Sequence, residues 1–382
     1  MKEIEKVTNH DVKAVEYFLK EHLASLPETA CLKEFVHFCC TSEDINNLSY
    51  ASMIKDSMRV VICPKVDKLL TVLAGLAQQS ASVPLLALTH GQAATPTTFG
   101  REVAVFVHRV KVQFLKLKCV DFCGKFNGAT GSFNAHIVAY PEVEWEAVSR
   151  DFVENSLGLT YQPVSTQIES HDYISELSDS LSRISSILIG LCRDMWSYTS
   201  RGVLKLRVVA GEVGSSTMPH KVNPIDFENA EGNLGLAISL FDHFSSKLVI
   251  SRLQRDLSDS TVLRTIGVAF SHFLIALDSL EKGLSKVDVN LDLCEAELNA
   301  NWSILAEPVQ TVMRKHGIAE PYERLKAFTR GRPEVDKSAM RSFIESISGE
   351  VPEPDFTVLK NLTPSTYIGL ALDITQKYGQ YP

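Results

Sequence analysis

An apolar stripe at helical spacing is the feature that most constrains what this chain can fold into. Between residues 174 and 195 the apolar side chains follow one another in alternating steps of three and four, which places them along one face of a helix of about six turns. The positions are Ile174, Leu177, Leu181, Ile184, Leu188, Leu191 and Met195. Segments 62–76 and 103–117 repeat the pattern. Because a 3/4 alternation forms the seam between helices that cross at shallow angles, the sequence predicts a helix bundle.

Strands are expected to be few, because runs that alternate apolar and polar residues are scarce. The predicted fold class is therefore all-α. At 382 residues the chain exceeds the usual size of one domain, so we expect one large domain with smaller appendages. The Pro-rich and charged sequence around 330–355 predicts a looser C-terminal region.

The charge balance narrows the kinds of partner. The formal net charge is −8 and the lysines and arginines form no run, so a nucleic-acid partner is not expected. The overall field will not attract an anionic substrate, which a few local cations and backbone N–H groups must therefore meet.

Cysteine usage and hydropathy predict a soluble, cytoplasmic protein. The eight cysteines include no Cys-x-x-Cys pair and no His cluster has zinc-site spacing, so we expect reduced thiols and no metal. The first six residues alternate charged and apolar side chains and lack the apolar core of a signal peptide. The most apolar stretches, such as 184–192, are far shorter than a membrane span, so no membrane partner is expected.

The polar loop from Gly214 to Pro224 is the sharpest candidate for chemistry. It reads Gly-Ser-Ser-Thr-Met-Pro-His-Lys-Val-Asn-Pro, so small residues, two serines and two prolines limit its conformations. Its polar groups are costly to bury without partners, and we expect the loop to be solvated or closed over a ligand. A generic surface loop is the competing interpretation of its composition.

Other polar clusters lie at the ends of predicted helices. His90, within Thr-His-Gly-Gln, stands just ahead of a helix, where backbone N–H groups can face an anion. Thr41 or Ser42, followed by acidic residues, is a helix N-cap signal, and a cap can also bind a carboxylate at the positive helix end. Segment 8–12 opens a helix, although residues 3–20 as a whole also suggest a helix entered part-way.

Three arginines form the last cluster. Arg252, Arg255 and Arg264 lie near Ser260 and could clamp a carboxylate or phosphate through paired hydrogen bonds. A solvated face paired with neighbouring aspartates explains the spacing equally well. The sequence contains no P-loop, dinucleotide fingerprint, nucleophile elbow or metal motif, so side chains without a cofactor are expected to carry the chemistry.

These clusters, in this order, resemble those of the fumarase/aspartase superfamily. The string Ser-Ser-x-Met-Pro-x-Lys-x-Asn at 215–223 is similar to the superfamily's signature. The variants at 41–47, 89–92 and 224–229 resemble the adenylosuccinate lyase family, in its bacterial long-form subgroup. The likeness runs from residue 3 to about residue 375, and so covers essentially the whole chain.

The resemblance implies a three-domain helical fold. Residues 1–31 would be the remnant of an N-terminal helical domain, 32–286 a central bundle or lyase domain, and 287–382 a C-terminal helical domain. It also implies a homotetramer whose active sites are each assembled from three subunits. The implied small-molecule substrates are succinyl-purine nucleotides of purine biosynthesis: adenylosuccinate, which gives AMP and fumarate, and SAICAR, which gives AICAR and fumarate. No cofactor is implied.

The resemblance also implies catalytic roles. Ser215 would take a proton from the carbon next to a carboxylate, and His90 would protonate the departing nitrogen. An isolated serine is a poor base, so N–H groups around the closed loop and Lys221 are expected to activate it. Glu228 would orient His90, and His10 would contact the nucleotide side.

Binding roles are carried over in the same way. Lys221 and Asn223 would hold a substrate carboxylate, Gln167 the base or linker, and Arg255 the nucleotide. The implied substrate-binding residues are Asn9, Asp11, Thr41, Ser42, Gln167, Val222, Asn223, Asn229, Arg255, Ser260, Thr261 and Arg264.

One departure and two alternatives accompany this prediction. The family's N-terminal Arg-Tyr pair, which contributes to phosphate binding, is absent, so either the chain is shortened or it grips the phosphate less completely. One alternative is a non-catalytic or weakly active homologue that acts as an assembly protein; the retained polar loops argue against it. The other is a different fumarate-releasing lyase, such as argininosuccinate lyase or aspartase, which the Thr-Ser-Glu-Asp and Met-Pro-His-Lys variants disfavour.

Overall fold

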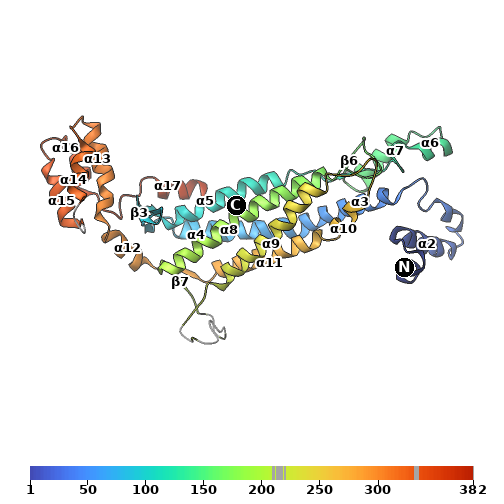
Figure 1. Cartoon of the computed structure of the whole chain (residues 1–382), viewed down its shortest axis with the longest axis horizontal. Coiled ribbons are helices and arrows are strands. Elements are labelled where there is room, and N and C mark those ends of the chain that lie inside the picture. Colours follow the sequence, from blue (N-terminus) through green and yellow to red (C-terminus); the bar gives the residue numbers. More distant parts are fainter. Residues whose placement is uncertain (209–210, 212–217, 219–220, 331–334, 382) are drawn as a thin grey trace. The chain divides into compact units, whose positions relative to one another are not determined.

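The computed structural model describes the chain from residue 1 to 381, apart from 209–210, 212–217, 219–220 and 331–334. Helices dominate it (Figure 1). The α-helices are α1 (Lys2–Thr8), α2 (Asp11–Ala24), α3 (Ser42–Ser57), α4 (Cys63–Gln79), α5 (Phe99–Leu117), α6 (Asn134–Ala139), α7 (Trp145–Asp151), α8 (Asp172–Arg201), α9 (Ile225–Lys247), α10 (Ser258–Leu263), α11 (Ile266–Leu284), α12 (Leu291–Asn299), α13 (Ala306–Lys315), α14 (Pro321–Thr329), α15 (Lys337–Ser346), α16 (Glu353–Asn361) and α17 (Ala371–Tyr378). Shorter helical turns are η1 (Ala30–Phe35), η2 (Met58–Ile62), η3 (Phe152–Ser156) and η4 (Trp302–Leu305).

Strands are short and pair only two at a time in the described chain. They are β1 (Pro84–Leu85), β2 (Leu88–Thr89), β3 (Gln92–Ala93), β4 (Thr97–Thr98), β5 (Cys123–Gly124), β6 (Thr160–Tyr161), β7 (Leu204–Leu206) and β8 (Val287–Val289). The pairs β1–β4, β2–β3 and β7–β8 are antiparallel, and β5–β6 is parallel. The predicted all-α class with few strands is thus confirmed.

The three predicted stripes all become helices. The stripe at 174–195 lies on α8, the stripe at 62–76 on the last residue of η2 and on α4, and the stripe at 103–117 on α5. Helix α8 is longer than the stripe, because it continues through polar residues to Arg201. Gly202 then adopts a φ of +81°, the left-handed conformation that commonly ends helices.

The described chain divides into two compact units, and each boundary between them falls within a helix. Unit 1 consists of Met1–Lys65, Phe114–Arg183 and Leu236–Leu274. Unit 2 consists of Val66–Gln113, Ile184–Gly235 and Ile275–Pro382. The three-domain division expected from the sequence therefore stays a prediction.

Aromatic packing joins helices within unit 1. The ring of Phe241 on α9 lies 6.2 Å from that of Phe270 and 6.3 Å from that of Phe273, both on α11. Such tilted and edge-on arrangements are the favourable ones for aromatic pairs. They fix the end of α9 against the start of α11, next to the segment that carries the pocket described below.

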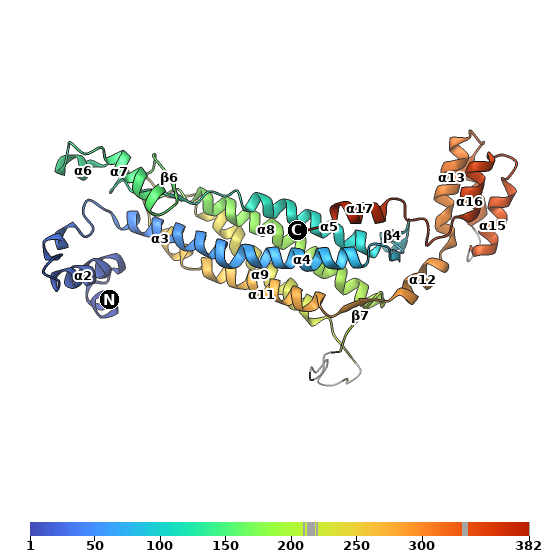
Figure 2. The ribbon, with the colours of Figure 1, turned by 180° about the vertical axis from the view of Figure 1, so that it is seen from behind.

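In unit 2, parts of α4, α5, α8, α9 and α11 lie side by side (Figures 1 and 2). Their facing side chains are buried, Leu73 on α4 and Leu188 on α8 completely so. The start of α5 approaches the end of α4 closely at Gly100. A Cβ added there would lie 2.4 Å from the carbonyl oxygen of Ala77 and 2.6 Å from the backbone of Ala81. This crossing therefore requires a glycine.

The C-terminal part of unit 2 has a core of its own. Trp302 and Leu305 of η4, Met313 of α13, and Met340 and Ile344 of α15 are buried together in it. The looser region predicted around 330–355 is therefore wrong for the described residues there. The charged residues and prolines of this region lie between buried residues that recur at helical spacing. Charge and proline content therefore do not indicate a loose segment here.

Helix α17 packs away from that core, against the bundle helices of unit 2. The side-chain amide of Gln78 on α4 donates to the carbonyl oxygen of Thr375 at 2.8 Å. The ring of His108 on α5 meets that of Tyr378 edge-on at 6.4 Å. The end of the chain is thereby part of the bundle surface.

One apolar stretch is longer than the sequence analysis allowed. By length and composition alone, the stretch Ser258–Leu284, which contains an 18-residue window with a mean hydropathy of 1.5, could cross a membrane. The prediction that the most apolar stretches are far shorter than a membrane span is wrong here, because this stretch tolerates isolated polar residues such as Ser271 and His272 within its apolar run. One such helix is weak evidence, since helices of soluble bundles pass the same test.

The close approach at Gly100 yields a stability prediction. Gly100→Ala should lower the apparent midpoint of thermal unfolding, at a cost of about 1–3 kcal/mol, because the new Cβ overlaps the α4 backbone. The matched control is Gly75→Ala on α4, whose Cβ meets nothing within 4 Å. That change should stabilise the helix by up to about 1 kcal/mol. Equal midpoints for the two variants would contradict the packing described.

Candidate active site

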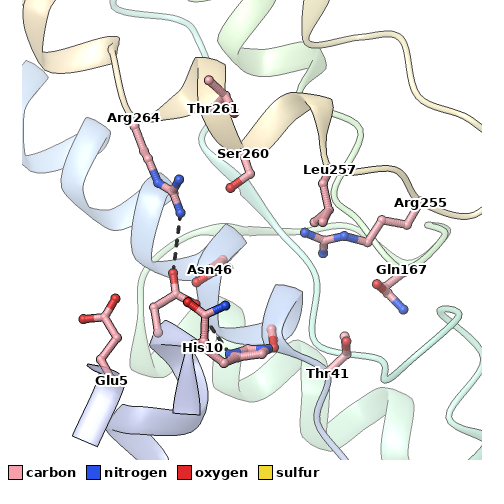
Figure 3. A pocket seen from close by; sticks show the side chains of 13 residues that line it. Glu5, His10, Thr41, Asn46, Gln167, Arg255, Leu257, Ser260, Thr261 and Arg264 are labelled. Carbon is pink, nitrogen blue, oxygen red and sulfur yellow. Dashed lines mark ion pairs between the residues drawn. The ribbon is translucent and has the colours of Figure 1, made fainter. Parts of the chain in front are cut away.

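A cavity of about 580 Å³ in unit 1 gathers most of the predicted site residues (Figure 3). Residues from α1, α2, α3, the loop before α8 and the segment around α10 line it. The predicted residues that it brings together are Asn9, His10, Asp11, Thr41, Ser42, Gln167, Arg255, Ser260, Thr261 and Arg264. These positions come from three distant parts of the chain, so the fold and not local sequence assembles the pocket.

His10 lies where one helix ends and the next begins. Asn9 has a left-handed φ of 50° and ends α1, so the single helix expected over 3–20 is in fact two. The Nδ1 atom of His10 accepts a hydrogen bond from the backbone N–H of Lys13 at 3.3 Å and caps α2. The segment 8–12 therefore opens a helix as predicted, with His10 as its N-cap. The histidine ring faces the pocket across from Arg264 (Figure 3).

Thr41 and Ser42 enter the pocket from the start of α3. Thr41 and Asp44 form the predicted capping box, in which the Asp44 Oδ2 atom accepts from the Thr41 N–H at 2.8 Å. Asp44 is fully buried, and its Oδ1 atom accepts from the Lys125 ammonium at 2.8 Å and from the Asn127 N–H at 3.1 Å. Burial lowers the pKa of Lys125, although the Asp44 charge opposes this. The positive end of α3 is therefore held rigidly toward the pocket.

The arginines differ in their surroundings. Arg252 is largely exposed and pairs with Asp256, as the solvated-face interpretation predicted. Arg255 is only 17% exposed and pairs with the Glu43 carboxylate at 2.8 Å, so it belongs to the pocket wall. Arg264 reaches across to Asp11 at 3.8 Å and stays largely exposed (Figure 3).

Gln167 connects the pocket loop to the segment before α10. Its backbone N–H donates to the carbonyl oxygen of Gln254 at 3.2 Å, and its side-chain amide donates to that of Ala129 at 2.9 Å. Two hydrogen bonds thus fix this residue beside Arg255.

Three further residues line the pocket that the sequence analysis did not select: Glu5, Asn46 and Leu257. Asn46 lies one helical turn after Ser42 on α3, so helical spacing within the quoted motif could have found it. Glu5 lies one turn before Asn9, but nothing in its local sequence marked it. Among the described residues, no three His, Cys, Asp or Glu side chains gather as metal ligands would.

His90 belongs to unit 2 and does not line this pocket. It lies at the tip of the β2–β3 hairpin, where His90 and Gly91 have φ values of 54° and 72°. The expectation that it directly precedes a helix is wrong, because α5 begins only at Phe99. An adjacent pair with positive φ is the turn type that two-residue hairpins favour.

Glu228 and Asn229 lie at the start of α9, also in unit 2. Glu228 accepts a hydrogen bond from the indole N–H of Trp196 at 3.0 Å, and Asn229 donates to the Ser279 hydroxyl at 2.7 Å. Within the described part of one chain, no hydrogen bond joins Glu228 to His90. The orienting role of Glu228 therefore remains a prediction.

The signature loop is described only in part. Ser215 lies outside the described residues. Lys221 and Val222 are exposed and Asn223 is half-buried in the segment that leads into α9, and the Lys221 N–H donates to the carbonyl oxygen of Met218 at 3.0 Å. Lys221, Val222 and Asn223 belong to unit 2.

The chain is similar to known protein families and to a solved structure. Residues 1–238 match the family described as "Lyase", and residues 251–368 match "Adenylosuccinate lyase C-terminal". The structure resembles that of 3-carboxy-cis,cis-muconate lactonizing enzyme from Pseudomonas putida, with a TM-score of 0.74 at 20% identity over 98% of this chain and 83% of that one. At that identity the likeness concerns the fold. The helical fold and the matched families define a lyase of the fumarase/aspartase superfamily.

Relatives with higher sequence identity show which family of lyases the chain belongs to. Adenylosuccinate lyases from Vibrio cholerae, Haemophilus influenzae and Escherichia coli are each 52% identical over 377 residues, which are 99% of this chain and 82% of each relative. The chain belongs to the adenylosuccinate lyase family. The resemblance inferred from the motifs is confirmed, and the alternatives of an assembly protein or another fumarate-releasing lyase are not favoured.

The buried pair beneath Thr41 gives a prediction. Lys125→Met should destabilise the protein by about 3–5 kcal/mol, because it leaves the buried Asp44 carboxylate without a counter-charge. The double variant Asp44→Asn/Lys125→Met, which removes both charges, should recover part of that loss. Urea unfolding followed by circular dichroism gives the free energy of unfolding of the wild type, of Lys125→Met, of Asp44→Asn and of the double variant. A double variant as unstable as the sum of its single variants would show that the pair is not coupled.

Proposed function

We propose that this chain releases fumarate from adenylosuccinate to give AMP, and from SAICAR to give AICAR, in purine nucleotide biosynthesis. The observation that carries the proposal is the pocket of unit 1, which gathers ten of the implied site residues in a chain of the adenylosuccinate lyase family. Its volume of about 580 Å³ is in the range of small-molecule sites.

The pocket suits the nucleotide end and one carboxylate of such a substrate. Arg264 and Ser260 offer donors for a phosphate, which a guanidinium can bind through two parallel hydrogen bonds. Thr41 and Ser42, at the positive end of α3, suit a carboxylate. Gln167 would contact the base or the linker. Asn9, His10, Asp11, Arg255 and Thr261 complete this set.

The elimination itself needs a base and an acid. In the proposed reaction Ser215 takes the proton from the carbon next to a carboxylate, a carbon–carbon double bond forms, and the carbon–nitrogen bond breaks. His90 gives its proton to the departing nitrogen. Lys221, Val222 and Asn223, with Asn229, hold the carboxylate on which negative charge develops, the stage at which fixed donors help most.

A homotetramer would bring these groups together. His90 and Lys221 belong to unit 2, whereas the pocket belongs to unit 1. Bundle helices also expose apolar side chains such as Leu115 and Leu236, which a second copy of the chain would cover. We therefore propose sites assembled from three subunits, in which Glu228 of one copy orients His90 of another. The relatives are bacterial enzymes, and we place this one in the cytoplasm.

The proposed acid and base can be tested directly. Ser215→Ala and His90→Ala should each lower kcat for fumarate release at least about 100-fold, because a positioned proton-transfer group typically contributes a factor of that order or more. The assay follows fumarate formed from adenylosuccinate. His316→Gln, outside the proposed site, should leave kcat unchanged. Turnover by Ser215→Ala and His90→Ala at the wild-type rate would refute the assigned roles.

Shared active sites predict complementation between inactive variants. Ser215→Ala and Arg264→Glu disable different parts of the site. When the two are mixed after dissociation and reassembled at random, about a quarter of the sites combine intact parts, so about a quarter of wild-type activity should return. The control is each variant reassembled alone. A mixture as inactive as the separate variants would show that each site lies within one chain.

A further inference from the structure

A buried histidine lies between two carboxylates behind the pocket. The Nδ1 atom of His171 is 3.2 Å from the Glu169 Oε2 atom, and its Nε2 atom is 3.5 Å from the Asp259 Oδ2 atom. His171, Glu169 and Asp259 are each at least nine-tenths buried. None of the three is among the residues that line the pocket.

The three residues connect two pocket walls that are far apart in sequence. Glu169 follows Gln167 by two positions, and Asp259 directly precedes Ser260 and Thr261 on α10. The Asp259 Oδ1 atom also accepts from the Ser260 N–H at 2.7 Å, so the orientation of Asp259 is coupled to the backbone of the pocket wall.

The donor requirement defines the charge of His171. Carboxylates only accept hydrogen bonds, and an imidazole donates from both nitrogens only when it is protonated. Burial by itself lowers the pKa of His171, but the hydrogen bonds and charges of Asp259 and Glu169 raise it to about 9. At neutral pH the ring is therefore a cation between two acceptors.

The backbone at this point is held in an uncommon conformation. His171 has a φ of 60°, in the left-handed region that residues other than glycine seldom adopt. Its N–H donates to the Glu169 Oε2 atom at 2.9 Å, and its carbonyl oxygen accepts from Ile174 at 3.0 Å and Ser175 at 3.1 Å in the first turn of α8. Such conformations persist where the surroundings overdetermine them and often occur near functional sites. Here the backbone N–H and the Nδ1 atom of His171 both meet the same oxygen of Glu169, the Oε2 atom.

We propose that His171 is a positioning residue for the lyase reaction: it bridges Glu169 and Asp259 and so sets the separation between Gln167 and the Ser260–Arg264 wall at which the nucleotide end of the substrate is bound. The inference rests on the proposed function. It assigns His171 no contact with the substrate and no proton transfer to it.

Loss of the His171 bridge should weaken nucleotide binding and leave the rate of the chemical step nearly unchanged. His171→Gln keeps a buried polar side chain but removes the cation that attracts both Glu169 and Asp259. The two carboxylates then repel each other, and the two pocket walls that carry them are no longer held together. The KM for adenylosuccinate and the Kd for AMP should both rise about tenfold or more, since small misplacements in a site are costly. The value of kcat at saturating substrate should stay within about threefold, because Ser215 and His90 are untouched.

A matched control and a second variant complete the experiment. His316→Gln removes an imidazole that lies 2.6 Å from the Asp355 carboxylate, in unit 2 and outside the pocket, and should change neither Kd nor KM. Asp259→Asn keeps the shape of the bridge and removes one charge, so it should weaken AMP binding in the same direction. If His171→Gln does not fold, Asp259→Asn provides the measurement.

The possible outcomes distinguish a failure of the positioning role of His171 from a failure of the proposed function. Wild-type AMP affinity in a variant that has lost only thermal stability would overturn the positioning role, and so would a lost kcat with unchanged Kd. A wild-type protein that neither binds AMP nor releases fumarate would overturn the proposed function, and the inference with it. Histidine NMR on the wild type adds an independent reading: a neutral His171 ring at pH 7 would contradict the bridge.

Discussion

The pocket depends on buried carboxylates that are each compensated by a single cation from another part of the chain. Asp44 is paired with Lys125, Glu43 with Arg255, and Asp259 with His171. An isolated buried charge is very costly, so each pair constrains the two segments that provide it. Three such pairs fix the start of α3, the segment after β5, the loop before α8 and the segment around α10 relative to one another within unit 1.

This arrangement explains how an acidic chain can bind an anionic substrate. The net charge of −8 gives no general attraction. Most cations behind the pocket are already committed to carboxylates, so their charge is used to hold the walls. Arg264, with only a distant partner, and the positive end of α3 remain for the ligand. Specific binding in this account comes from preorganised local donors.

The sequence was informative wherever the governing interaction is local. Apolar spacing located α8, and the Thr41–Asp44 capping box was visible because its partners are three residues apart. Pairs such as Lys125 with Asp44, 81 residues apart, leave no periodic signal, and neither does the bridge at His171. The resemblance to a family supplied most of the pocket residues.

Local errors also have physical causes. His90 was placed ahead of a helix, but a His-Gly pair with positive φ closes a hairpin instead, and the helix starts later. The break in the helix over 3–20 depends on the histidine ring nitrogen of His10 acting as a cap, a role that Asn or Asp usually plays. Glu5 was missed because its part in the pocket arises from how α1 folds back beside α2.

A substrate panel tests the central claim most directly. Fumarate release would be measured from adenylosuccinate, argininosuccinate, aspartate and malate at equal concentrations. The account predicts release from adenylosuccinate, with the other three substrates at background. Comparable release from argininosuccinate or aspartate, or none from adenylosuccinate, would contradict it.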